Sequence, residues 1–270
     1  MAQTNSFKGY YTAKEVKERL GITDGMLYNY VRYGHLERVM PPGRKQGVYK
    51  KEEVDKFALE MQAFLGSREE SKSVTFTPVS KSDIEETVRL TNEIFHTQLD
   101  RNIRLSWVTR NPQVSYQLCV NGSVLGVVTM LPLKPEKIEQ ILRGEANSEE
   151  TKPEEIEVYE PGRPYHLYAM GVGVSSVLSR FEKRLYGSKL ITGLYETILE
   201  FGKQGIEIET ISARSHTVDG IRILRHIGFK QIPSITKDVN FCIDVPSSEI
   251  PFAQQYREAL ASAKARRKKR

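Results

Sequence analysis

The sequence predicts two domains: a small all-α domain, then a larger α/β (α+β) domain in which helices flank a mixed sheet. Two short capped helices follow one another within residues 12–33, with apolar residues at helical spacing. Residues 66–73 are polar and aperiodic, which is typical of a linker. From residue 165 to 229, short apolar strands alternate with amphipathic helices, as in layered α/β units.

Composition narrows the class of protein. The 270 residues are 39% hydrophobic and 27% charged with a net charge of +6, which is ordinary for a globular protein. No run approaches the roughly 18 apolar residues of a membrane span, and the N-terminus lacks a secretory layout. We therefore expect a cytoplasmic protein with no membrane contact. Cys119 and Cys242 are expected to be reduced core thiols, and the histidine spacing predicts no metal site.

The first domain is expected over residues 1–65. Thr12 and Glu15 form a capping-box pattern at the start of its first helix. Gly21 ends that helix, Thr23 caps the second, and Gly34 stops the second. Two helices joined by about three residues that include a glycine form a helix-turn-helix.

A longer pattern covers residues 10 to about 60. It consists of Tyr-Thr-x-x-Glu-x-x-x-x-Leu-Gly-Ile, Tyr-x-x-x-Gly-x-Leu and Arg-x-x-Gly-x-Tyr, met by Tyr11, Thr12, Glu15, Leu20, Gly21, Ile22, Tyr30, Gly34, Leu36, Arg44, Gly47 and Tyr49. The pattern resembles the winged helix-turn-helix DNA-binding domain of MerR and excisionase-like proteins. That resemblance implies double-stranded DNA as a partner and a nucleoid-associated transcriptional regulator.

In such a domain the second helix enters the major groove and the wing grips the neighbouring backbone. Asn29 suits adenine, and Arg32 suits guanine or phosphate. The other expected DNA contacts lie on this helix or around the basic wing: Thr23, Tyr28, Tyr33, Arg44, Lys45, Lys50 and Lys51. The alternative is a small helical module that binds protein. We also expect a homodimer, held by the second domain because residues 51–65 run directly into the linker.

The second domain is expected over residues 74–248. Its first half should contain a strand at 74–79, a helix at 82–95, a hairpin of strands 114–120 and 124–130 around Asn121-Gly122, and a helix at 135–143. Residues 145–160 hold seven glutamates against one lysine. This charge run predicts a solvated, mobile loop.

The second half should contain a strand at 165–174, a helix from about 188 to 203, a strand at 206–211 and a helix at 218–227. Arg184-Leu-Tyr-Gly-Ser-Lys189 precedes the expected start of the first of these helices. A helix N-terminus favours anions, and Gly187 permits close approach. Arg184, Gly187, Ser188, Lys189 and Leu190 are thus a candidate phosphate site, although a short basic glycine loop by itself more often only caps a helix.

The order strand, Arg-x-x-Gly-x-x, helix, strand, helix ending in Gly228-Phe229 resembles the acyl-CoA-binding core of the GNAT acetyltransferase family, over about residues 74–245. The resemblance implies that the loop holds the pyrophosphate of acetyl-CoA or another acyl-CoA. Lys189 stands where the family has Gly or Ala. Leu224 stands where it has the tyrosine that protonates the leaving thiolate. His166 and Tyr168, on one face of a predicted strand, are the nearest acid/base candidates.

Residues 249–270 should form a helix at 251–264 and a basic tail. Residues 264–270 carry six positive charges, equal to the whole net charge, and should be disordered alone. The tail is expected either to solubilise the chain end or to contact DNA phosphates. Taken together, the sequence favours a DNA-binding regulator with an acyl-CoA-binding, acetyltransferase-like domain. The alternatives are an active N-acetyltransferase tethered to DNA and a catalytically inactive scaffold or dimerisation domain.

Overall fold

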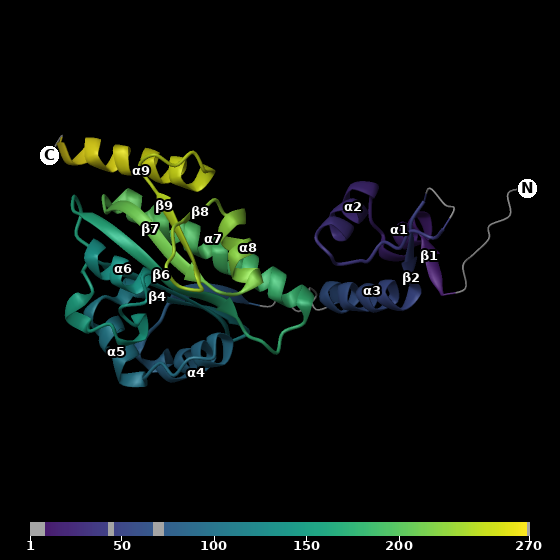
Figure 1. The fold of residues 1–270 in the computed structure, drawn as a ribbon, viewed down its shortest axis with the longest axis horizontal. Helices are drawn as coiled ribbons and strands as arrows, with labels where there is room; N and C mark the ends of the chain where they lie inside the picture. The colour runs from purple at the N-terminus through teal and green to yellow at the C-terminus, as the bar shows by residue number, and fades with distance from the viewer. Residues whose placement is uncertain (1–8, 43–45, 67–72, 269–270) are drawn as a thin grey trace, which may run out of the picture. The chain divides into compact units, whose positions relative to one another are not determined.

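The structure is a computed structural model that describes residues 9–42, 46–66 and 73–268 (Figure 1). It divides into two compact units, one within residues 1–72 and one within residues 73–270. Most of the predicted linker at 66–73 lies outside the described residues. Among the described residues, no helix has both the length and the apolar character that crossing a bilayer requires.

The first unit packs its helices around one small apolar core. Its elements are β1 (Tyr10–Thr12), α1 (Ala13–Leu20), α2 (Asp24–Arg32), β2 (Val48–Lys50) and α3 (Lys51–Gly66). The predicted capping box is confirmed: Glu15 N–H donates to Thr12 Oγ1, and Thr12 N–H donates to Glu15. Gly21 ends α1 with φ 64°, a left-handed conformation that glycine adopts readily. An antiparallel β1–β2 pair is added to the expected all-α arrangement.

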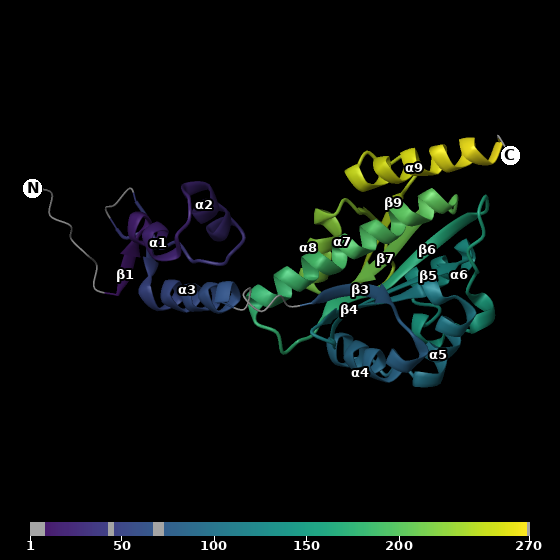
Figure 2. The ribbon, with the colours of Figure 1, turned by 180° about the vertical axis from the view of Figure 1, so that it is seen from behind.

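The second unit is built on a seven-stranded sheet (Figures 1 and 2). Its strands are β3 (Val74–Pro78), β4 (Ser115–Val120), β5 (Ser123–Leu133), β6 (Pro164–Val174), β7 (Glu207–Ser215), β8 (Lys230–Ile232) and β9 (Val239–Asp244). They are ordered β3-β4-β5-β6-β7-β9-β8. Among the described strands of this sheet, the β6–β7 pair alone is parallel. The predicted mixed sheet is therefore confirmed.

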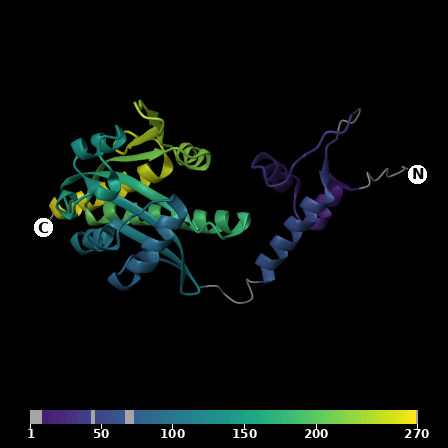
Figure 3. The same cartoon turned by 60° about the horizontal axis from the view of Figure 1, so that its bottom comes forward.

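Helices cover both faces of this sheet. They are α4 (Ile84–Phe95), α5 (Arg101–Arg110), α6 (Pro135–Leu142), α7 (Arg180–Gln204), α8 (Val218–His226) and α9 (Pro251–Lys268), with 3₁₀ turns at Lys81–Asp83, Pro112–Val114, Ser148–Glu150 and Pro153–Glu155. One core joins α7 and α9 to the strands. A second core joins α4, α5 and α6 to the opposite face. Figure 3 brings α4 and α5 forward.

The acidic segment 145–160 is packed against α5, so the prediction of a solvated, mobile loop is wrong. Trp107 Nε1 donates to the Thr151 carbonyl at 2.7 Å, and Asn111 Nδ2 donates to the Glu157 carbonyl at 2.8 Å. Ile156 is fully buried. The glutamate side chains remain at least partly exposed, so water can solvate their charges although the main chain is held in place.

The basic tail is helical as far as Lys268, so the prediction of disorder from residue 264 is wrong over that stretch. Tyr256 explains why α9 stays docked: its hydroxyl donates to the Ile206 carbonyl at 2.8 Å and accepts from Ile208 N–H. Lys264 Nζ lies 2.6 Å from Glu207 Oε2, which ties the end of α9 to β7. Residues 269–270 lie outside the described residues.

Candidate functional site

The parallel strands β6 and β7 separate part-way along the sheet. Their pairing runs from Pro164–Glu207 to Ala169–Ala213 and stops there, whereas β6 continues beside β5 as far as Val174. Residues 169–174 are all partly exposed. Beyond Ala169, the N–H and C=O groups of β6 on the side of β7 are not paired with that strand. A ligand with amide groups could pair with them, as an added strand does.

A bulge marks the point of separation. Thr129 of β5 pairs with Gly171 and Met130 pairs with Ala169, so Met170 is the extra residue of β6. Bulges of this kind redirect the strand, and they recur beside active sites. A Cβ at Gly171 would lie 3.0 Å from Phe95 of α4, so the helix can press on the strand only because this residue is glycine.

The segment between β6 and α7 is held by Glu93 of α4. Its Oε1 accepts hydrogen bonds from Ser175 Oγ at 3.2 Å and from Ser176 N–H at 3.2 Å and Oγ at 2.6 Å. These bonds, led by the one from the Ser176 hydroxyl, lower the pKa of the Glu93 carboxyl. The start of α7 is thereby fixed beside the end of β6.

Helix α7 begins at Arg180, so the predicted start near Ser188 is wrong. Ser179 and Glu182 form a capping box, in which Glu182 N–H donates to Ser179 Oγ at 3.2 Å. The helix can begin at this cap and continue through Gly187, because a glycine inside a helix lowers its stability by only about 1 kcal/mol. The loop predicted at Arg184–Lys189 is helical, so no helix N-terminus lies at Gly187 to Leu190. Ser188 and Lys189 are exposed and Leu190 is buried.

Arg180 and Arg184 of α7 and Arg222 of α8 are all exposed, and the charges of Arg180 and Arg222 act on Arg184. Partial burial lowers the pKa of the Arg184 guanidinium, and the nearby charges of Arg180 and Arg222 lower it further. Arg222 belongs to α8, which follows β7, and helices that follow two parallel strands start at the same edge of the sheet. We call Arg180, Arg184 and Arg222 the arginine cluster. An anion bound there would reduce the repulsion among these positive charges.

His166 and Tyr168 share one face of β6, on the side opposite α7. His166 Nδ1 lies 2.9 Å from Thr210 Oγ1. Tyr168 is 3% exposed, within the core formed by α4, α5 and α6. Burial raises the pKa of its hydroxyl, which keeps the proton at neutral pH. Leu224 of α8 packs against the other core. The structure therefore places both candidates before the strand separation and on the other face from the arginine cluster.

In the first unit, α2 presents most of its surface to solvent. Only Leu27 of this helix is buried. Asn29 and Arg32 are exposed, Tyr28 is 65% exposed, and Arg32 lies 5.8 Å from the centre of the Tyr33 ring.

Three further residues expected to contact DNA form contacts within the first unit, and two lie outside the described residues. Thr23 Oγ1 accepts from Met26 N–H at 3.4 Å and so caps α2. Lys50 forms ion pairs with Glu37 and Glu53 at 3.4 and 3.3 Å. Lys51 Nζ lies 5.0 Å from the centre of the Tyr11 ring. Arg44 and Lys45 lie outside the described residues.

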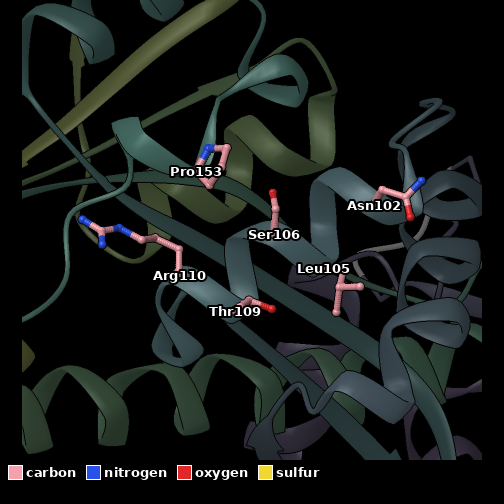
Figure 4. A pocket seen from close by; sticks show the side chains of 6 residues that line it. All are labelled: Asn102, Leu105, Ser106, Thr109, Arg110 and Pro153. Carbon is pink, nitrogen blue, oxygen red and sulfur yellow. The ribbon is translucent and has the colours of Figure 1, made fainter.

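A separate shallow groove of about 540 Å³ lies along the outer side of α5 (Figure 4). It is lined by Asn102, Leu105, Ser106, Thr109, Arg110 and Pro153, and none of the predicted site residues is among them. Within the part of the chain that the structure describes, no group of three or more His, Cys, Asp or Glu side chains could hold a metal ion.

The sequence matches no protein-family model and no curated protein. Among solved structures, the chain is similar to Arabidopsis thaliana Naa50 in complex with a bisubstrate analogue, with 13% identity, 63% of this chain and 98% of that chain covered, and a TM-score of 0.42. It is similar to Arabidopsis thaliana NAA60 in complex with acetyl-CoA, with 15% identity, 64% and 99% covered, and a TM-score of 0.43.

A further similarity is to the loading GNATL domain of CurA from Lyngbya majuscula, with 14% identity, 65% and 100% covered, and a TM-score of 0.46. At these scores and identities, the likenesses assign no activity to this chain.

Two members of the arginine cluster, Arg180 and Arg222, were not predicted from the sequence. Ser179-Arg-Phe-Glu182 has the capping-box spacing, and with Lys183 and Arg184 it would have placed a cationic helix start at residue 180. Nothing in the sequence marks Arg222, because only the parallel β6–β7 pair brings α8 beside α7.

Proposed function

We propose that residues 73–268 bind an acyl-CoA and transfer its acyl group to an amine. The observation that carries this proposal is the separation of β6 from β7 with the arginine cluster at the same edge of the sheet. Acyl-CoA combines phosphates with a long arm that contains amide groups. The arginines would bind the phosphates through charge-assisted hydrogen bonds. The arm would pair with the free edge of β6, as an added strand does.

In the proposed reaction, the lone pair of the amine nitrogen attacks the thioester carbonyl carbon. The carbon–sulfur bond then breaks, and its electron pair leaves with the CoA sulfur. The amine loses one proton to solvent or to His166, and the thiolate gains one. Leu224 cannot supply that proton, so the reaction would depend mainly on placing the two reactants together. Orientation alone can contribute about 7–11 kcal/mol.

Calorimetric titration with CoA and acetyl-CoA tests this proposal. We expect both to bind, and we expect Arg184→Ala to weaken binding about 10-fold or more, because a hydrogen bond to a charged group contributes about 1.5–3 kcal/mol. Lys203→Ala is the matched control, because Lys203 lies at the other end of α7 and pairs with Glu200. Failure of the wild-type protein to bind CoA would exclude the proposed function. Thiol release with a panel of amines then distinguishes turnover from binding alone.

We propose, second, that residues 9–66 bind double-stranded DNA as part of a homodimeric regulator. The exposed α2 face with Tyr28, Asn29 and Arg32 supports this, because a recognition helix needs polar side chains that are free of the core. We expect Arg32→Ala to cost about 1–3 kcal/mol of affinity at the preferred site and to relax base preference at one position. Footprinting on randomised duplexes at moderate salt measures this.

Arg19→Ala serves as the control for the DNA experiment, because Arg19 of α1 pairs with Asp55 at 2.8 Å. Protection of two half-sites would support the homodimer. Equal loss of affinity for all sequences in both variants would leave only nonspecific binding, and the specific proposal would be wrong.

A further inference from the structure

Arg104 of α5 is fully buried, yet only one of its side-chain nitrogens has a hydrogen-bond partner. Nη1 donates to Thr129 Oγ1 at 2.6 Å. Nε and Nη2 are enclosed and have no partner among the described residues. Among the described residues, no carboxylate forms an ion pair with it.

Burial of this side chain is costly. It lowers the pKa of Arg104 to about 10, so the guanidinium is still charged at neutral pH. The Trp107 ring, whose centre lies 5.9 Å from the guanidinium carbon, offsets little of this cost through a cation–π contact. A buried charge without a counter-ion is strongly unfavourable, so the arrangement favours an anion from outside the chain.

Arg104 is anchored beside the point where β6 leaves β7. Its partner Thr129 pairs with Gly171, the residue after the bulge at Met170. Thr129 and Gly171 face α4 and α5, as the contact between Gly171 and Phe95 shows. The guanidinium therefore lies on the α4–α5 side of the strand separation, whereas the arginine cluster lies at the start of α7.

We infer that Arg104 binds the carboxylate of the acceptor, which makes the acceptor an amino acid or another amine that carries a carboxylate. The inference rests on the proposed acyl transfer. Nε and Nη2 form one edge of the guanidinium, and that edge binds the two oxygens of a carboxylate in parallel. Because an amino group lies close to the carboxylate in an amino acid, anchoring one end presents the other to the thioester. Because Arg104 is fully enclosed, the residues that pack around it must move for the carboxylate to reach it.

The test uses N-acetylated glycine, alanine, leucine and glutamate, each beside its carboxamide, in calorimetry with and without CoA. These probes resemble the product and need no turnover. We expect at least one acid to bind about 10-fold or more tightly than its amide, because a charged hydrogen bond contributes about 1.5–3 kcal/mol. Arg104→Met should remove this preference, and Arg104→Lys should keep part of it.

Thermal unfolding and CoA titration of the same variants separate the possible causes. Arg104→Met should be folded and at least as stable as the wild type without ligand, because it removes an uncompensated charge. It should also bind CoA normally. Equal binding of acids and amides by the wild type, or an unchanged preference in Arg104→Met, would overturn the inference. Absence of CoA binding in the wild type would instead refute the proposed function, whatever the acids do.

Discussion

Replacement of Trp107 by alanine is expected to lower the free energy of unfolding of the second unit by about 3–5 kcal/mol, the range for truncating a buried aromatic side chain. Trp107 is fully buried in the core that α4, α5 and α6 share with the sheet. Alanine would leave a cavity there. It would also leave the Thr151 carbonyl, which accepts from the indole, without its donor. Urea denaturation followed by circular dichroism measures the change.

Fluorescence cannot follow this variant, since Trp107 is the only tryptophan of the chain. Trp107→Phe is the matched control: it fills most of the volume but loses the hydrogen bond, so it should cost less than the alanine variant. Limited proteolysis should also cleave residues 145–160 faster in the alanine variant. A loss below about 0.5 kcal/mol, the range of most surface substitutions, would show that Trp107 does not hold the acidic segment.

The sequence predicted elements whose pattern is local. Asn121-Gly122 predicted a tight hairpin turn, and both residues have positive φ, 52° and 83°, as that turn requires. The Thr12–Glu15 box is likewise decided by residues three apart, and it is confirmed.

Helix α5 was not predicted, because its buried face lacks the usual apolar periodicity. Its buried residues are Arg104, Trp107 and Val108, and an arginine on the inner face breaks the apolar periodicity on which helix prediction depends. The acidic segment was mistaken for a mobile loop for a related reason. Its charge is visible in the sequence, but the side chains that hold its backbone are Trp107 of α5 and Asn111, the residue that follows this helix.

The candidate site was predicted in part. Arg184 was expected to contact phosphate and does lie in the arginine cluster, but the helix starts earlier than expected and the chain brings Arg180 into the cluster as well. The separation of β6 from β7 depends on which strands pair and over how many residues. That is a tertiary property, and the spacing of residues within β6 does not predict it.

Reversing the charge of Arg222 is expected to weaken CoA binding more than the substitution Arg184→Ala does. In Arg222→Glu the new carboxylate would lie near Arg184 and Arg180, where it would neutralise them and repel phosphate. We expect CoA affinity to fall about 100-fold, the combined effect of losing one charged hydrogen bond and adding one repulsion. Calorimetry at two salt concentrations should also show a weaker dependence of affinity on salt.

Arg225→Glu is the control on the same helix, because Arg225 donates to Gln231 at 2.9 Å and is not among the charges that act on Arg184. Both reversals change the net charge equally, so a general electrostatic effect would weaken CoA binding to the same extent in each. Only a local phosphate site predicts a large difference between them. Equal losses would place the phosphates elsewhere on the unit, even if the protein binds CoA.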